Sequence, residues 1–288
     1  MTWQFTITGL AVGVLVGMTG MGGGSLMTPI LILLFGFNAN VAVGTDILHG
    51  AIFKTFGAAH HRRLGTVHAR LACWMLLGSA PMSLVGVEVA DHLGDRVDDS
   101  MGRLVGAALV VGGIGFFVKT FLRGRHPSDA PFLLARRDRV LAIAIGASCG
   151  FVVGLTSVGS GTFFGLAMLL LYPLTAQKIV GTDLFHAAAL LWVAGLSHLL
   201  HGNVDTHAMA WLLVGSVPGV LLGSHLSIRV PDRALRIAFS LILLLSGIKL
   251  LDMPPTPAIV LVVLGPGAML AVLVLRLLAT RRVAPAPD

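Results

Sequence analysis

The stretch GMTGMGGGSLMTPI, residues 17–30, lies inside a long apolar run near the start of the chain. Five of its first eight residues are glycine. Glycine is among the poorest residues for the interior of a helix, so we expect the first apolar segment to break here. The sequence on either side of this break predicts its structure and its role.

The amino-acid composition is typical of a membrane protein. The chain has 288 residues, of which 56% are hydrophobic and 11% are charged, and its mean hydropathy is +0.90. A soluble domain carries about 25% charged residues. Apolar segments run from end to end, which predicts an all-α polytopic membrane protein. The formal net charge is +7, but most of the arginine lies in a few loops, which favours topology signals over a nucleic-acid surface.

The apolar segments are distributed over the whole chain. We place them at 5–19, 25–37, 39–59, 69–90, 101–122, 139–155, 161–174, 178–200, 208–228, 234–251 and 257–279. The two cysteines lie inside apolar segments, and the histidines near the segment ends match no strong ligand pattern. We therefore expect no disulfide, no metal site and no cofactor.

The chain repeats itself with a constant offset. The motif VGTD at 43–46 recurs at 180–183, and the offset is the same at both ends of the repeat (154 − 17 = 137 and 223 − 86 = 137). The other matched pairs are Gly17 and Gly154, Thr19 and Thr156, Gly22 and Gly159, Gly24 and Gly161, His49 and His186, Gly65 and Gly202, Trp74 and Trp211, Pro81 and Pro218, and Gly86 and Gly223. Such a gapless match predicts two structural copies, as in many secondary transporters.

Loop charge indicates that the two copies are inverted. The loop HHRRLGTVHAR at 60–70 is basic, whereas its counterpart HLLHGNVDTHA at 198–208 has no lysine or arginine. The next loop reverses this bias, because 91–103 is net acidic and 227–236 contains three arginines. By the positive-inside rule, equivalent loops then face opposite sides of the membrane. The basic linker and C-terminal tail are expected in the cytoplasm and the N-terminus outside.

Inversion requires an odd number of crossings in each copy, and this explains the glycine-rich break. Segments 39–59, 69–90 and 101–122 give three crossings, so the pair 5–19 and 25–37 must add an even number. Each arm is about 20–22 Å long as a helix, too short for a hydrocarbon core of about 30 Å. We therefore predict a re-entrant hairpin, with one broken spanning helix in each copy as the rival. The organisation is repeat 1 at 1–122, a cytoplasmic linker at 123–138, repeat 2 at 139–251, and a C-terminal transmembrane helix with a basic tail at 257–288.

The hairpin tips are candidates for an anion site. Irregular backbone survives at membrane depth only where it lines protein or a wet cavity. A glycine-rich tip followed by a helix presents free backbone N–H groups and a positive helix end, which suit an anion. The alternative is that the glycines only permit close helix packing. The candidate substrate-binding residues at the tips are Gly22, Gly23, Gly24, Ser25, Gly159, Ser160, Gly161 and Thr162.

The repeated VGTD motif supplies the intramembrane charges. Asp46 and His49 lie about one helical turn apart, as do Asp183 and His186, so each pair shares a helix face. Lys54 lies roughly 80° around the same helix from Asp46, and its counterpart is Leu191.

Three interpretations of these side chains stay open. The carboxylates and histidines carry a proton that is coupled to transport, or they shape the field around an anion together with Lys54. Alternatively, Asp46 and Asp183 are helix caps or buried hydrogen-bonded groups that hold the hairpins. The preceding Thr45 and Thr182 add hydroxyl groups to the candidate binding site.

These motifs resemble the TauE/SafE family of membrane permeases, the sulfite and organosulfonate exporters. The resemblance rests on GMTGMGGGSLMTPIL at 17–31, AVGTDILHGAIFKTFGAAHHRRLGTV at 42–67, GLTSVGSGT at 154–162 and IVGTDLFHAA at 179–188. Serine stands at 157 and 160, where the first copy has glycine at 20 and 23, and aspartate follows G-T in both copies where many members have serine. The resemblance implies transport of a small sulfur-containing anion across the bacterial inner membrane.

We therefore predict a secondary transporter, and more specifically an exporter, of a small anion such as sulfite, an organosulfonate or a related sulfur oxyanion. Proton-coupled anion uptake stays open as an alternative, as does a cation transporter that uses Asp46 and Asp183. A membrane scaffold without transport of its own is the third class. No nucleophile–base constellation or nucleotide loop is present, so an enzyme is not expected. GxxxG-like spacings leave a homodimer open.

Overall fold

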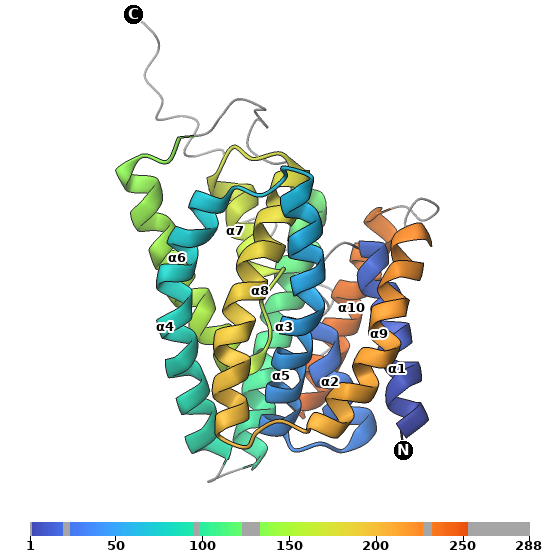
Figure 1. Cartoon of the computed structure of the whole chain (residues 1–288). Helices are drawn as coiled ribbons and strands as arrows, with labels where there is room; N and C mark the ends of the chain where they lie inside the picture. The colour runs from blue at the N-terminus through green and yellow to red at the C-terminus, as the bar shows by residue number, and fades with distance from the viewer. Residues whose placement is uncertain (1, 20–23, 95–97, 123–132, 227–231, 253–288) are drawn as a thin grey trace, which may run out of the picture.

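The computed structural model describes residues 2–19, 24–94, 98–122, 133–226 and 232–252, and this part of the chain contains ten helices and no strand (Figure 1). Their bounds are α1 Thr2–Thr19, α2 Gly24–Phe35, α3 Ala39–Arg63, α4 Ala69–Gly94, α5 Asp98–Phe121, α6 Arg136–Thr156, α7 Phe163–Leu171, α8 Ala176–Leu200, α9 Thr206–Leu226 and α10 Asp232–Leu250. Each matches one predicted segment. The predicted final span at 257–279 lies outside the described residues.

Four of the described helices are long and apolar enough to cross a membrane. They cover Ala69–Leu93, Ser100–Phe121, Arg136–Thr156 and Ala176–Leu200. Shorter apolar helical stretches cover Thr2–Val16, Leu26–Phe35, Thr206–Leu222 and Ser240–Leu250. Large apolar side chains such as Leu77, Leu221 and Leu245 are exposed on the surface, as expected where the solvent is lipid.

Helix ends follow local signals that the two halves share. Asn38 caps α3, and its side chain accepts a hydrogen bond of 2.9 Å from the N–H of Asn40. Thr175 caps α8, and its hydroxyl accepts from the N–H of Lys178. The residues after these helices include Gly65 and Gly202, with φ angles of 68° and 77°, a conformation that favours glycine. The matched glycines therefore mark the same turn in both halves.

Two helix pairs at the edges of the molecule are held by close glycine contacts. Figure 1 shows α1 beside α9 at one edge and α4 beside α6 at the other. A Cβ atom added at Gly13 of α1 would lie 2.5 Å from the carbonyl oxygen of Ser216 in α9. A Cβ atom added at Gly150 of α6 would lie 2.5 Å from the carbonyl oxygen of Ser79 in α4. These two contacts are related by the sequence repeat, and each joins one half of the chain to the other.

Two further pairs lie between these edges, and in each pair the helices are antiparallel. Along α3 and α8, Gly50 contacts Leu191 and Gly57 contacts Leu184, so one residue number rises as the other falls. Helices α5 and α10 are antiparallel by the same argument, because Gly106 lies against Gly247 and Gly113 lies against Ser240. Equivalent helices of the two halves thus run in opposite directions where they meet.

The arms of the predicted hairpins differ from expectation in length. We expected arms of similar size that are too short to span. Instead α1 has 18 residues and α2 has 12, while α6 has 21 and α7 has 9. The prediction that each arm is too short is wrong for α6, which is long enough to cross. It begins earlier than 139 because the carboxylate of Asp138 accepts from the N–H of Ala135, 2.9 Å away, and so caps a polar first turn.

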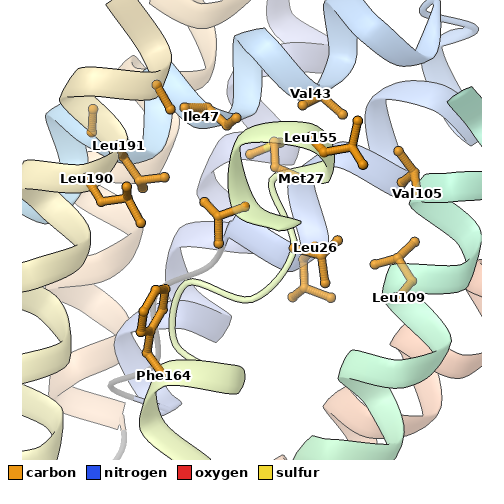
Figure 2. Packing of buried hydrophobic residues seen from close by; sticks show 14 of the residues in the cluster. Leu26, Met27, Val43, Ile47, Val105, Leu109, Leu155, Phe164, Leu190 and Leu191 are labelled. Carbon is orange, nitrogen blue, oxygen red and sulfur yellow. The ribbon is translucent and has the colours of Figure 1, made fainter. Parts of the chain in front are cut away.

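The apolar core surrounds the connection between α6 and α7. Figure 2 shows this connection as a loop enclosed by buried side chains from several helices. The labelled members are Leu26, Met27, Val43, Ile47, Val105, Leu109, Leu155, Phe164, Leu190 and Leu191. Irregular backbone is thus held inside protein rather than against lipid, as membrane depth requires.

Candidate functional site

The connection from Ser157 to Thr162 forms the centre of the candidate site. Ser157 has a φ of 61°, and Gly159 and Gly161 have φ angles of 118° and 113°. These conformations favour glycine, which explains two of the glycines in GLTSVGSGT. Ser160 and Thr162 are buried, and the Thr162 hydroxyl has no hydrogen-bond partner among the described residues.

Asp46 links α2 to the α6–α7 connection through one carboxylate oxygen. Its Oδ2 accepts a hydrogen bond of 2.5 Å from the hydroxyl of Thr28 in α2 and one of 2.9 Å from the hydroxyl of Ser157. The side chain is 1% exposed. Buried polar groups stabilise a fold only when they are paired. Asp46 therefore connects three parts of the chain that are distant in sequence.

Lys54 places a buried cation on the second hairpin. Its ammonium donates to the hydroxyl of Ser160 at 2.7 Å and approaches the carbonyl oxygen of the same residue at 3.4 Å. Lys54 is 1% exposed and lies within electrostatic range of both Asp46 and Asp183. Lys54 and Asp46 thus bond to the same α6–α7 connection, at Ser160 and Ser157, and the predicted role of Lys54 in charge tuning stays a prediction.

Lys119 supplies a second cation that the sequence interpretation missed. Its ammonium donates to the carbonyl oxygen of Gly161 at 3.3 Å, from near the end of α5. It also occupies the space where a Cβ of Gly165 would lie. The available signal was a lysine inside an apolar segment, three residues from the end of that segment.

Asp183 occupies the position equivalent to Asp46 but has different surroundings. It is 7% exposed, and no described residue donates a hydrogen bond to its carboxylate. Its electrostatic neighbours are Lys119 and Lys54. The position equivalent to Thr28 is Gly165, so the hydroxyl that reaches Asp46 has no counterpart here.

The helix-capping interpretation of the two aspartates is wrong. The caps of α3 and α8 are Asn38 and Thr175. Asp46 and Asp183 lie about two turns inside these helices, beyond the backbone N–H groups that a cap satisfies.

His49 and His186 bond to serines on the opposite half of the chain. The Nε2 atom of His49 lies 2.9 Å from the hydroxyl of Ser216, and that of His186 lies 2.8 Å from the hydroxyl of Ser79. Each histidine thus ties α3 or α8 to a neighbouring helix, and neither is hydrogen-bonded to the aspartate one turn before it. A small crevice lined by Val12, Gly13, Val16, His49, Gly50, Phe53 and Ser216 lies beside the first pair.

Thr45 and Thr182 have loop partners. The Thr45 hydroxyl accepts from the N–H of Asp205 at 2.9 Å, and the Thr182 hydroxyl accepts from the N–H of His68 at the same distance. Both threonines are fully buried. Their hydroxyls therefore hold the loops before α9 and α4, and their predicted contact with substrate stays a prediction.

The predicted tip residues of the two halves differ in what the structure describes. Gly22 and Gly23 lie outside the described residues, and for Gly24 and Ser25 the structure describes only the start of α2. The two serines of the second tip, in contrast, have identified roles. Ser157 donates to Asp46 and Ser160 accepts from Lys54, which explains why these positions differ from the glycines of the first copy.

The arrangement has the chemistry of an ion-binding site. The buried ammonium of Lys54 and the partly buried ammonium of Lys119 bond to a loop that carries hydroxyls and precedes a helix N-terminus, and the buried carboxylates of Asp46 and Asp183 lie within electrostatic range of Lys54. Among the described residues, no group of three or more His, Cys, Asp or Glu side chains is arranged to hold a metal ion.

Comparisons with known proteins agree with a transport role. The family described as "Sulfite exporter TauE/SafE" matches residues 5–250. "Probable membrane transporter protein YjnA" of Bacillus subtilis (strain 168) is 40% identical over 256 residues, covering 87% of this chain and 100% of that protein. "Probable membrane transporter protein YdhB" of the same organism is 23% identical over 239 residues, covering 83% of this chain and 96% of that protein. A "Probable membrane transporter protein" of Xylella fastidiosa (strain 9a5c) is 25% identical over 229 residues, covering 77% of this chain and 83% of that protein.

No solved structure is significantly similar to the chain. The family match covers most of the sequence, and the first of these relatives aligns over its full length. The chain is thus a multi-pass membrane transporter and not an enzyme, and it belongs to the TauE/SafE sulfite exporter family.

Proposed function

We propose that the protein exports a small sulfur oxyanion, such as sulfite or an organosulfonate, across the bacterial inner membrane. The observation that carries this proposal is the pair of lysines at the second hairpin. Lys54 and Lys119 both direct their ammonium groups at consecutive residues of one buried loop, Ser160 and Gly161. Ammonium groups form strong, charge-assisted hydrogen bonds with anions, so two of them at one loop favour an anion there.

The start of α7 adds to the attraction for an anion. The first N–H groups of a helix lack partners within the helix, and this end carries a partial positive charge. Thr162 caps α7, and its buried hydroxyl has no partner among the described residues. The proposed anion therefore contacts the loop from Gly159 to Thr162, between the two lysines.

The proposed architecture is two inverted repeats, at 1–122 and 139–251, joined by a cytoplasmic linker. The antiparallel packing of α3 with α8 and of α5 with α10 supports inversion. So does the opposite charge of equivalent loops, which also favours an external N-terminus and a cytoplasmic C-terminus. In this proposal both hairpins are re-entrant, and a further span follows α10. A homodimer stays a prediction.

Transport proceeds by alternating access in this proposal. One repeat rocks against the other around a site near the midplane, as in other transporters built from inverted repeats. Without proton coupling, a monovalent anion that leaves an inside-negative cell gains about 2.3 kcal/mol per 100 mV, so the membrane potential alone would favour export.

A cation transporter that uses Asp46 and Asp183 is the main rival. Both carboxylates lie within electrostatic range of Lys54, which lowers their attraction for a second cation. Asp46 also already accepts two hydrogen bonds through one oxygen. These contacts favour an anion as the transported ion.

The test is ion flux in vesicles that contain the purified full-length protein. We expect sulfite and small sulfonates to move faster than in protein-free vesicles. Sodium and potassium should not move. Flux of a cation alone would contradict the proposal, and so would the absence of flux for every ion.

A further inference from the structure

Equivalent aspartates of the two halves have unequal surroundings, and the difference lies in hydrogen-bond donors. Asp46 accepts from Thr28 and Ser157, whereas no described residue donates to the carboxylate of Asp183. Hydroxyl donors stabilise the charged form of a carboxylate. Asp183 is balanced only by the nearby charges of Lys54 and Lys119.

Lys54 and Lys119 are cationic side chains at this site, and Asp46 and Asp183 are its carboxylic side chains. All four side chains belong to one electrostatic cluster, because Lys54 interacts with both carboxylates and Lys119 interacts with Asp183. An anion that binds the two ammonium groups competes with the Asp183 carboxylate for their positive charge. A buried carboxylate that loses its compensating charge is costly unless it is protonated.

We propose that Asp183 is the counter-ion that the transported anion replaces, and that Asp183 takes up a proton when the anion binds to Lys54 and Lys119. This inference rests on the proposed anion transport. One proton from water adds to the Asp183 carboxylate and leaves again when the anion is released. Asp46 keeps its charge and its two donors, and so holds the two hairpins together throughout.

The other groups near Asp183 do not offer a better proton acceptor. His186, one turn further along α8, is already bonded to Ser79 through Nε2 and packs against Phe164 with ring centroids 4.4 Å apart. The thiol of Cys149 in α6 is also within electrostatic range. On α3, Asp46 and His49 have partners of their own, in Thr28 with Ser157 and in Ser216.

The inference is tested by titrating the detergent-solubilised full-length protein with methanesulfonate in buffers of different ionisation enthalpy. The charge of this probe does not change near neutral pH, so any proton taken up belongs to the protein. We expect uptake of about one proton per anion bound, and an affinity that falls about tenfold for each unit rise in pH. Binding without proton uptake by the wild-type protein would overturn the inference.

Variants of Asp183 locate the proton. Asp183→Asn should bind methanesulfonate with no proton uptake and with an affinity that no longer depends on pH. Asp183→Ser gives the same readout if the first variant does not fold. The control Glu88→Gln removes an exposed carboxylate outside the site and should still take up the proton. Proton uptake that persists without Asp183 would contradict the assignment.

This experiment separates the two proposals. If neither methanesulfonate nor sulfite binds or moves across vesicles, the proposed function fails and this inference fails with it. If the anion binds and moves but no proton accompanies it, anion transport stands and the role of Asp183 is refuted.

Discussion

The two halves of the molecule place the same motif, VGTD, in the same position on equivalent helices, yet give its carboxylate different partners. In the first half, Asp46 is held by hydroxyls from both hairpins. In the second half, Asp183 faces lysines and no described hydrogen-bond donor. A repeat that is symmetric in backbone has therefore become asymmetric in charge.

This difference arises from a few side chains. Position 28 is threonine where 165 is glycine, 157 is serine where 20 is glycine, and 54 is lysine where 191 is leucine. The helix contacts stay matched, as shown by His49 with Ser216 and His186 with Ser79. The contacts between helices are therefore the same in the two halves, while the side chains around the two aspartates differ.

The largest effect should come from replacing Lys54 with leucine, the residue at the equivalent position 191 of the second half. Lys54→Leu introduces the residue found at 191 and leaves buried carboxylates without their shared cation. Removing one partner of a buried ionic group costs about 3–5 kcal/mol, so we expect a large fall in thermal stability and loss of anion binding. Thermal unfolding with and without sulfite measures both. The same change at the exposed lysine of α10, Lys249→Leu, is the control and should preserve binding.

The second prediction concerns two matched glycine contacts, one from each half, that should contribute equally to stability. Gly13→Leu and Gly150→Leu each force a side chain against the backbone of a serine in the partner helix. We expect each to lower the free energy of unfolding by about 3 kcal/mol, at the upper end for overpacking, because backbone cannot move aside easily. Denaturation of the purified protein measures this loss.

The control for these glycines is Gly102→Leu, where an added Cβ meets no atom within 4 Å. It should leave stability nearly unchanged. A strongly unequal result for Gly13 and Gly150 would show that the two edges of the molecule are not equivalent.

The third prediction concerns the donors that only Asp46 has. Thr28→Val keeps the shape of the side chain but removes the hydroxyl that reaches Asp46, and we expect a loss of about 2 kcal/mol. Thr120→Val is the control, because its hydroxyl bonds to the Phe116 carbonyl of its own helix. Equal stability of the two variants would mean that the bond to Asp46 contributes little.

The smallest effect should come from the loop that follows α8. His201 lies 3.3 Å from Glu88, and its pKa is raised chiefly by its hydrogen bond to the Ser197 carbonyl, with Glu88 and Asp91 adding to the effect. A raised pKa stabilises the fold at pH below the ordinary value of 6.5, and this contribution is lost as pH rises through the raised pKa.

The measurement for this loop is unfolding at several pH values. Because both side chains are largely solvated, the contribution should be at most about 1 kcal/mol. His201→Ala should lose stability at acidic pH and match the wild type at alkaline pH. The equivalent position in the first half is Leu64, so no such dependence is expected there. A loss that is the same at every pH would point to packing instead of charge.

Much of this fold could be predicted from the sequence, because hydropathy and the constant offset report directly on helices and on the repeat. The position of each described helix and the reach of Lys54 follow from periodicity alone. The partners of Asp46 could not be predicted, since Thr28 and Ser157 are distant in sequence and hydroxyl residues are common in membrane helices. The length of α6 was underestimated because its first turn is polar and depends on the Asp138 cap.

The central claim is that one anion binds at the second hairpin, beside Lys54 and Lys119. The most direct test is a crystal structure of the protein with 2-bromoethanesulfonate, in which anomalous scattering from bromine locates the ligand. Our account predicts a single site beside the α6–α7 connection, with the sulfonate in contact with the Lys54 ammonium and the Thr162 hydroxyl. Bromine found only at the first hairpin, or only among the basic loops, would contradict it.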